Sequence, residues 1–119
     1  MTTTQTYQGG CHCGAVRYEV DLELGDVIAC NCSICSKTGW LLAFAPASAF
    51  RCSTPQSNLG DYQFAKKHIH HEFCRTCGVR SFGWGLDGDG NKMVSVNVRC
   101  LDGVDVSTLA ITHYDGASL

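Results

Sequence analysis

Two short cysteine pairs in this chain have the spacing of zinc ligands, and each is followed directly by glycine. They lie in residues 11–14, with the order Cys-His-Cys-Gly, and in residues 74–78, with the order Cys-Arg-Thr-Cys-Gly. A glycine after the second sulfur suits a metal knuckle, because the turn that aims backbone N–H groups at thiolates needs a residue that tolerates positive φ. Four thiolates complete the tetrahedral shell of a structural zinc ion. We therefore predict one closed zinc site with the ligands Cys11, Cys13, Cys74 and Cys77.

Three further cysteines lie close together in the chain and lack that glycine. They are Cys30, Cys32 and Cys35, and Ser36 follows the last of them. Three thiolates leave one position of a tetrahedral zinc ion open, as in catalytic sites, which keep a position for water or substrate. The sulfur count therefore indicates one zinc ion that holds the fold and a second that does chemistry.

The open position also has candidate protein ligands, which would make the second site structural too. His68, His70 and His71 lead into Cys74 on one predicted strand. Side chains alternate between the faces of a strand, so His68 and His70 share one face and His71 takes the other. A histidine on a strand is more often an ordinary surface or core residue than a ligand. A buried water, Cys52 or an iron–sulfur cluster in place of zinc are further alternatives.

The composition favours a single reduced domain. At 119 residues the chain has room for one core. Its cysteine count of 9 is odd, and most have C-x-C or C-x-x-C spacing, which favours metal binding in the cytoplasm over the disulfides of a secreted domain. Residues 1–10 lack the basic and apolar regions of a signal peptide, and no stretch is as long as a transmembrane helix. We expect a cytoplasmic protein with no membrane partner.

The charge argues against a nucleic-acid partner. The formal net charge is -2, and bound thiolates outweigh the charge of two zinc ions, so the loaded protein is more acidic still. No basic stripe is present to neutralise phosphates. The basic residues instead offset the thiolate charge, meet a small acidic substrate, or form a solvated strand end; they are Lys37, Lys66, Lys67, His68, Arg75 and Arg80.

The elements that must position the cysteines are short strands. Apolar and polar residues alternate over 16–21 and over 94–99, as in half-buried strands. Further strands are predicted over 27–30, 41–45, 62–65, 68–73 and 79–84. Two single helical turns are predicted at 33–38 and 106–109, each with a serine or aspartate able to cap it. The fold class is therefore all-β, with small sheets and both knuckles at loop ends.

Some residues fall outside these motifs. Cys52 and Cys100 are expected to be buried small apolar residues. Phe44 and Phe82 are expected in the core, whereas Trp40 and Trp84 could line a pocket beside the second zinc or belong to the core. Residues 85–90 form a hairpin turn rather than a calcium loop, because Lys92 stands where the loop's glycine is required.

The cysteine motifs, with their flanking residues, resemble those of the glutathione-dependent formaldehyde-activating enzyme family, which includes centromere protein V. The matching segments are residues 10–18, 30–35, 73–78, 97–104 and 115–116. The resemblance gives domain boundaries of 9–116, with tails at 1–8 and 117–119. It implies a β-tent-like fold of short antiparallel sheets with a structural zinc on Cys11, Cys13, Cys74 and Cys77 and a catalytic zinc on Cys30, Cys32 and Cys35.

The activity implied by this resemblance is formation of S-hydroxymethylglutathione from formaldehyde and glutathione, the reverse of a carbon–sulfur lyase reaction. The partners are then a small thiol, glutathione or similar, and a small aldehyde. A thiol in the open zinc position is held as thiolate, which is the nucleophile. The alternative is a zinc-stapled binding or scaffold module without turnover.

Overall fold

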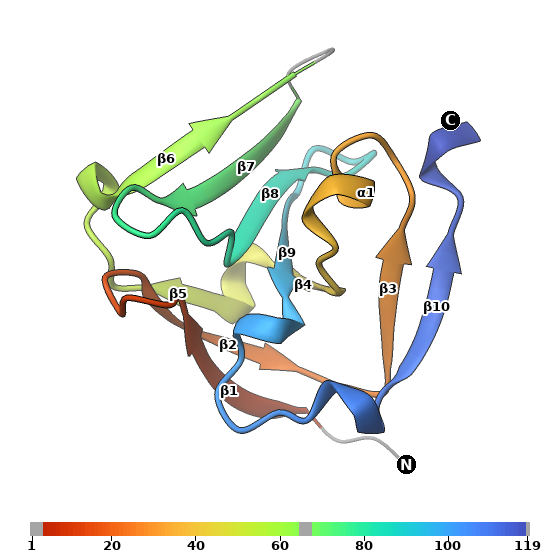
Figure 1. Ribbon diagram of the computed structural model, residues 1–119, viewed down its shortest axis with the longest axis horizontal. Coiled ribbons are helices and arrows are strands. Elements are labelled where there is room, and N and C mark those ends of the chain that lie inside the picture. The colour runs from red at the N-terminus through yellow and green to blue at the C-terminus, as the bar shows by residue number, and fades with distance from the viewer. Residues whose placement is uncertain (1–3, 65–67, 119) are drawn as a thin grey trace.

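The computed structural model describes residues 4–64 and 68–118, and over these ranges the chain forms mostly short β-strands (Figure 1). A three-stranded antiparallel sheet has the order β1-β2-β5. A seven-stranded sheet has the order β10-β3-β4-β9-β8-β7-β6. The strands are β1 (Gln5–Gly10), β2 (Arg17–Leu22), β3 (Asp26–Cys30), β4 (Leu42–Pro46), β5 (Phe50–Cys52), β6 (Leu59–Tyr62), β7 (Ile69–Cys74), β8 (Phe82–Leu86), β9 (Lys92–Asn97) and β10 (Ala110–Tyr114). The predicted all-β class is confirmed.

The helical elements are single turns. They are α1 (Cys35–Thr38), η1 (Ala47–Ala49), η2 (Gln56–Asn58), η3 (Val98–Cys100), η4 (Val106–Thr108) and η5 (Gly116–Ser118). Asp105 caps η4, since its carboxylate accepts a hydrogen bond from the Ser107 N–H at 3.0 Å, as predicted. The predicted serine cap of α1 is wrong, because Ile34 occupies the N-cap position and no side chain caps the helix.

Three regions differ from the sequence-based expectation. Strand β1 begins at Gln5, inside the stretch 1–8 expected to be a tail, and residues 5–8 pair with β2. Strand β10 pairs with β3 in parallel, whereas antiparallel sheets were expected. Parallel strands need a long connection between them. Here the two strands come from opposite halves of the chain, so no local sequence pattern predicts their pairing. Strand β6 also lies earlier than predicted; of its expected range, Ala65 lies outside the described residues.

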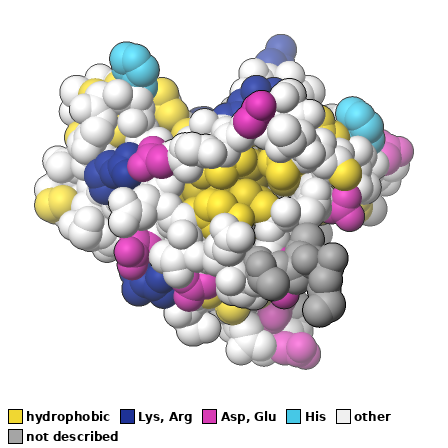
Figure 2. Space-filling model, turned by 90° about the horizontal axis from the view of Figure 1, so that it is seen from below, with side chains coloured by type: hydrophobic (Ala, Val, Ile, Leu, Met, Phe, Trp, Pro, Cys, Tyr) yellow, Lys and Arg dark blue, Asp and Glu magenta, His cyan; other side chains and the backbone are white. Residues whose placement is uncertain are grey.

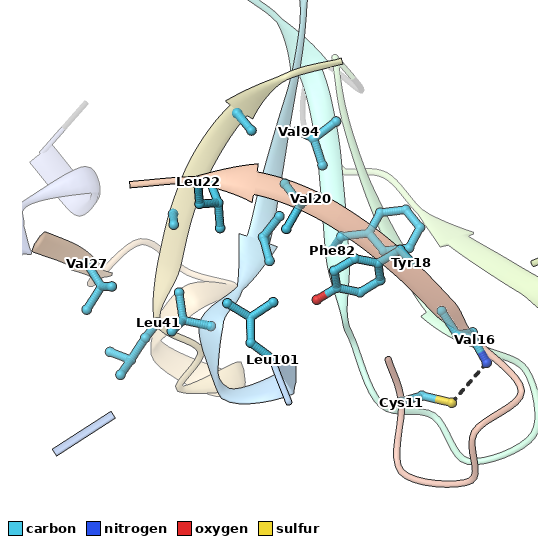
Figure 3. Packing of buried hydrophobic residues seen from close by; sticks show 14 of the residues in the cluster. Cys11, Val16, Tyr18, Val20, Leu22, Val27, Leu41, Phe82, Val94 and Leu101 are labelled. Atoms are coloured by element: carbon cyan, nitrogen blue, oxygen red, sulfur yellow. Dashed lines mark hydrogen bonds between the residues drawn. The ribbon is translucent and has the colours of Figure 1, made fainter. Parts of the chain in front are cut away.

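The core lies between the two sheets (Figure 3). Val20 and Val96 are fully buried and Val16 almost so, with exposed fractions of 0%, 0% and 1%. The predicted alternation is visible in β2, where Tyr18, Val20 and Leu22 are buried and the residues between them are half-buried. Burial of a side chain of this size contributes about 1.5–3 kcal/mol, so β2 is the strand that fixes the small sheet on the large one.

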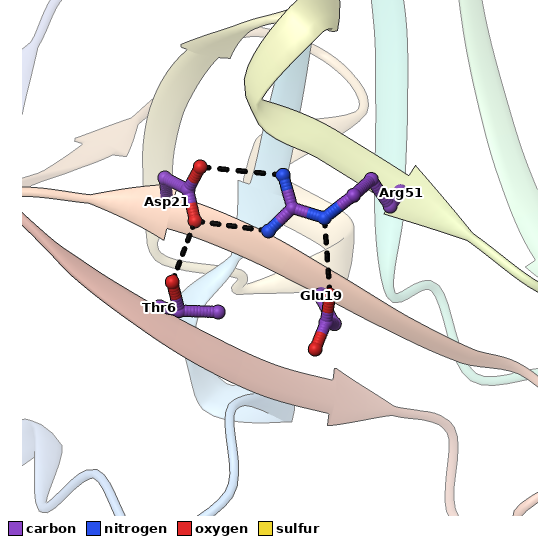
Figure 4. A network of polar contacts seen from close by, with 4 residues as sticks. All are labelled: Thr6, Glu19, Asp21 and Arg51. Atoms are coloured by element: carbon purple, nitrogen blue, oxygen red, sulfur yellow. Dashed lines mark hydrogen bonds and ion pairs between the residues drawn. The ribbon is translucent and has the colours of Figure 1, made fainter.

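An exposed polar network crosses the outer face of the three-stranded sheet (Figure 4). Arg51 of β5 donates to Glu19 at 3.0 Å and to both carboxylate oxygens of Asp21, at 2.9 and 3.2 Å. Thr6 of β1 donates to the same Asp21 at 2.8 Å. The Arg51 guanidinium lowers the pKa of Asp21. Exposed ion pairs of this kind each contribute little to the free energy of folding. The network is therefore better understood as a consequence of how β1, β2 and β5 are aligned than as a source of stability.

The surface seen from below in Figure 1, where β1 and β2 lie, gathers hydrophobic side chains in a central hollow with acidic and basic side chains around it (Figure 2). Among residues 4–64 and 68–118, no helix is long and apolar enough to cross a membrane.

Candidate metal centres

The first cysteine cluster joins loops that are distant in sequence. Cys11 and Cys13 lie between β1 and β2, whereas Cys74 ends β7 and Cys77 lies in the turn that follows. The four sulfurs all lie within 4.8 Å of one another. Cys13 Sγ lies 3.6 Å from both Cys11 Sγ and Cys74 Sγ. The cluster therefore connects the small sheet to the large one, and its geometry could hold a metal ion.

Backbone N–H groups point at these sulfurs. Val16 N–H donates to Cys11 Sγ at 3.2 Å (Figure 3), and Thr76 N–H donates to Cys74 Sγ at 3.3 Å. Gly14 and Gly78 have φ of 85° and 80°. A Cβ at either glycine would meet no atom within 4 Å, so the left-handed backbone, and not lack of space, requires glycine. The predicted knuckle conformation is confirmed.

The N–H donors favour ionised sulfur. Hydrogen bonds from the N–H groups of Val79 and Cys13 lower the pKa of Cys77 to about 6. The N–H of Cys77 is the main cause of a lowered pKa at Cys74. At Cys13 the Ala15 N–H acts in the same direction, but burial and the neighbouring thiols together raise the pKa to about 11. A crowded set of four cysteines fits a dication, because the ion replaces thiol protons when it binds.

The second cluster is built at the junction of β3 and α1. Cys30 ends β3, Cys32 lies in the following turn and Cys35 begins α1. Their three sulfurs lie within 4.8 Å of one another, and among the described residues no fourth cysteine, histidine or carboxylate lies within that distance of all three. The buried Trp40 indole N–H donates to Cys35 Sγ at 3.1 Å. In the part of the chain that the structure describes, the arrangement thus offers three thiolates and no cysteine, histidine or carboxylate as a fourth ligand.

The pKa values of Cys32 and Cys35 in this cluster shift in opposite directions. Burial disfavours the Cys32 thiolate, but the N–H groups of Cys35 and Ile34 and the adjacent thiols outweigh it and lower the pKa of Cys32. Burial raises the pKa of Cys35 to about 12, although the Trp40 N–H opposes the shift. Thiolates stabilised by N–H donors are the ligands that zinc prefers, so the donor set fits that ion.

The C-terminal segment closes against the second cluster. Asn31 N–H donates to the Tyr114 carbonyl at 3.2 Å, and its side-chain amide bonds Asp115 at 3.0 Å and the Ala117 N–H at 2.9 Å. This places Gly116 so close that a Cβ there would lie 2.6 Å from Cys30 Sγ. Residue 117, expected to begin a tail, is thus part of this contact. Sequence reasoning missed these roles, although Asn31 and Gly116 lie within the motifs it used.

A cavity of about 430 Å³ opens beside the second cluster. Its wall includes the three cysteine residues and is otherwise mostly apolar, with Trp40, Leu42, Phe44, Phe64, Ile69 and His71 among its lining residues. Trp40, left open by the sequence, is therefore a cavity residue. Phe44, expected in the core, is 50% exposed and lines this cavity instead, because its position in β4 faces away from the small sheet. Phe82 is buried in the core as expected.

The three candidate histidines lie in different environments. His71 is buried and lines the cavity. His70 lies on the other face of β7, where it stacks on Trp84 with ring centroids 4.0 Å apart and bonds Asp61 at 2.6 Å. His68 is exposed. None of these three histidines has a ring nitrogen within 4.8 Å of all three sulfurs of Cys30, Cys32 and Cys35. The alternation predicted for β7 is thus observed.

The remaining cysteines lie outside both clusters. All nine thiols of the chain are free. Cys52 and Cys100 are half-buried, where full burial was expected. Cys52 ends the edge strand β5 and Cys100 lies in the turn η3, and their thiols donate weakly to the backbone carbonyls of Arg17 and Arg80, respectively. Lys66 and Lys67, considered above as balancing charges, lie outside the described residues.

The sequence matches the family model of the glutathione-dependent formaldehyde-activating enzyme over residues 6–113. The chain belongs to this family. The match spans both cysteine clusters of the formaldehyde-activating enzyme fold. A crystal structure of a Rhodobacter sphaeroides protein is similar, with 36% sequence identity and a TM-score of 0.75, over 88% of this chain and 99% of that one.

Proposed function

We propose that this chain is a cytoplasmic enzyme with two zinc ions that forms or cleaves the carbon–sulfur bond of an adduct between a small thiol and a small aldehyde, such as S-hydroxymethylglutathione. Cys11, Cys13, Cys74 and Cys77 hold a structural ion, and Cys30, Cys32 and Cys35 hold a catalytic one. The observation that supports this division is the asymmetry of the clusters: four sulfurs in one, and three beside a cavity in the other.

The catalytic ion supplies Lewis acidity, which lowers the pKa of a thiol or water bound to it. The chain's own residues hold and shield the reactants. The Trp40 N–H fixes Cys35, Asn31 fastens the C-terminal segment beside Cys30, and the apolar cavity wall limits water at the reacting atoms.

The bond changes are simple. A substrate thiol loses its proton, and a sulfur lone pair forms a bond to the aldehyde carbon. The carbonyl π pair moves to oxygen, which takes up a proton, and the product is a hemithioacetal; cleavage reverses each step. Because this addition is facile in water, the protein contributes mainly capture and orientation of the two reactants.

The test is turnover of a formaldehyde–glutathione mixture by the zinc-loaded protein, with Cys32→Ser and Cys52→Ser as matched variants. Each removes one half-buried thiol, but only Cys32 belongs to a cluster. We expect Cys32→Ser to abolish turnover and remain folded, and Cys52→Ser to retain it. A non-catalytic zinc module predicts instead that no variant differs and that thiols leave the metal at Cys30, Cys32 and Cys35 unperturbed.

A further inference from the structure

The cavity beside the second cluster is poorly matched to a charged ligand. Of the described residues, no lysine, arginine, aspartate or glutamate lines it. Its volume of about 430 Å³ is also far larger than formaldehyde can fill. The group that fills the cavity must therefore be part of the thiol substrate. The three thiolates beside the cavity would outweigh the charge of the one zinc ion proposed there, so burial of a further carboxylate is costly. The wall therefore selects against a substrate body that carries charge.

His71 supplies one directed polar group in this cavity. Its Nδ1 lies 3.0 Å from the Tyr62 carbonyl oxygen. A carbonyl can only accept, so Nδ1 carries the hydrogen and donates, and the neutral ring leaves Nε2 as an acceptor. The ring is held by the rings of Phe64 and Trp40, with centroids 5.4 and 6.1 Å away. Burial also lowers the pKa of His71, in keeping with the neutral form.

Building on the proposed function, we propose that the substrate thiol has an uncharged, apolar body that fills this cavity, and that His71 Nε2 accepts a hydrogen bond from the hydroxyl of the thiol–aldehyde adduct. The apolar wall then provides affinity, and the histidine orients the hydroxyl. Glutathione, with two carboxylates and an ammonium group, is the weaker partner of this site.

A sulfur-free probe tests the cavity independently of the reaction. Benzyl alcohol has an aromatic body and one hydroxyl, toluene lacks the hydroxyl, and 4-(hydroxymethyl)benzoate adds a charge. Binding to the zinc-loaded protein is followed by NMR shifts of the Ile28 and Leu42 methyl groups, which line the cavity. We expect benzyl alcohol to bind at least about 10-fold more tightly than the benzoate, because no lysine or arginine among the described residues lines the wall and three thiolates outweigh the charge of the one zinc ion.

His71→Asn isolates the hydrogen bond, since asparagine keeps an N–H near the Nδ1 position and removes Nε2. We expect it to weaken benzyl alcohol binding about 5-fold, as for loss of one hydrogen bond, and to leave toluene binding unchanged. His70→Asn, one residue away on the opposite face of β7, is the matched control and changes neither. Equal weakening of both ligands by His71→Asn would overturn the role assigned to Nε2.

Turnover separates this inference from the proposed function. With formaldehyde as the common aldehyde, we expect benzyl mercaptan to be a better substrate than glutathione. If glutathione is preferred and Lys37→Ala reduces that preference, the substrate is a charged thiol that reaches Lys37 in the adjacent hollow of about 260 Å³, and the apolar assignment is wrong. If the parent protein turns over none of these thiols but still binds benzyl alcohol, the proposed function is overturned, whereas the cavity is supported as a ligand site.

Discussion

Gly116→Ala probes the contact between the C-terminal segment and the second cluster. The added Cβ would lie 2.6 Å from Cys30 Sγ and 3.2 Å from Cys32 Cβ, so either a sulfur or the backbone must shift. The backbone is fastened by the Asn31 amide to Asp115 and Ala117, which makes the sulfur the group that yields. Overpacking of this kind costs about 1–3 kcal/mol.

If that cost falls on the geometry of the metal-bound cluster, zinc affinity at Cys30, Cys32 and Cys35 falls by about 5- to 150-fold. The assay is zinc competition with a chromogenic chelator, which resolves a weak and a tight site. The affinity of the four-cysteine site should not change, and Gly88→Ala, where an added Cβ meets no atom within 4 Å, should change neither. A second-site affinity within about 2-fold of the parent protein would refute the reasoning.

Three further predictions concern stability and follow from the two clusters and one buried carboxyl. Cys74→Ser should unfold the domain where Cys32→Ser does not, because binding energy at a structural zinc is folding energy; circular dichroism of both zinc-loaded variants checks this, and a Cys74→Ser protein that melts like the parent would contradict it. Gly78→Ala should lower the free energy of unfolding by about 1–2 kcal/mol in denaturant titrations, because alanine is strained at positive φ, whereas Gly88→Ala should have no comparable effect. Burial raises the pKa of Glu72, so its stabilising contribution is present below the unfolded pKa and is lost as pH rises through the folded pKa. With zinc in excess, Glu72→Gln should therefore raise the melting temperature by more at about pH 8 than at about pH 5.5, and equal differences at both pH values would contradict this.

The sequence predicted the two clusters well because their chemistry is local. Cysteine spacing and the following glycine separate the two sets, and positive φ at Gly14 and Gly78 is the property on which that separation relied. The same reasoning placed His70 and His71 on opposite faces of one strand. It could not tell which face meets the cavity, because that depends on how β7 packs against strands far away in sequence.

Apart from the α1 cap and the bounds of β6, the features that sequence reasoning missed are long-range. The parallel pairing of β10 with β3 brings the C-terminus beside Cys30, and the role of Asn31 exists only in that arrangement. Phe44 is an apolar residue of the kind that usually lies in a core. The small sheet does not cover the side of the seven-stranded sheet on which Phe44 lies, so Phe44 lines the cavity there.

The central claim is that one metal ion is enclosed by four cysteines while the other has three and an open position. Cadmium NMR of the cadmium-loaded protein tests it directly, because each ion gives its own signal and the chemical shift reports the number of sulfur ligands. We predict one four-sulfur signal that is insensitive to added thiol and one signal of lower sulfur number that moves toward the four-sulfur range when thiol binds. Two four-sulfur signals in the absence of thiol, or a second signal that saturating thiol leaves in place, would contradict the account.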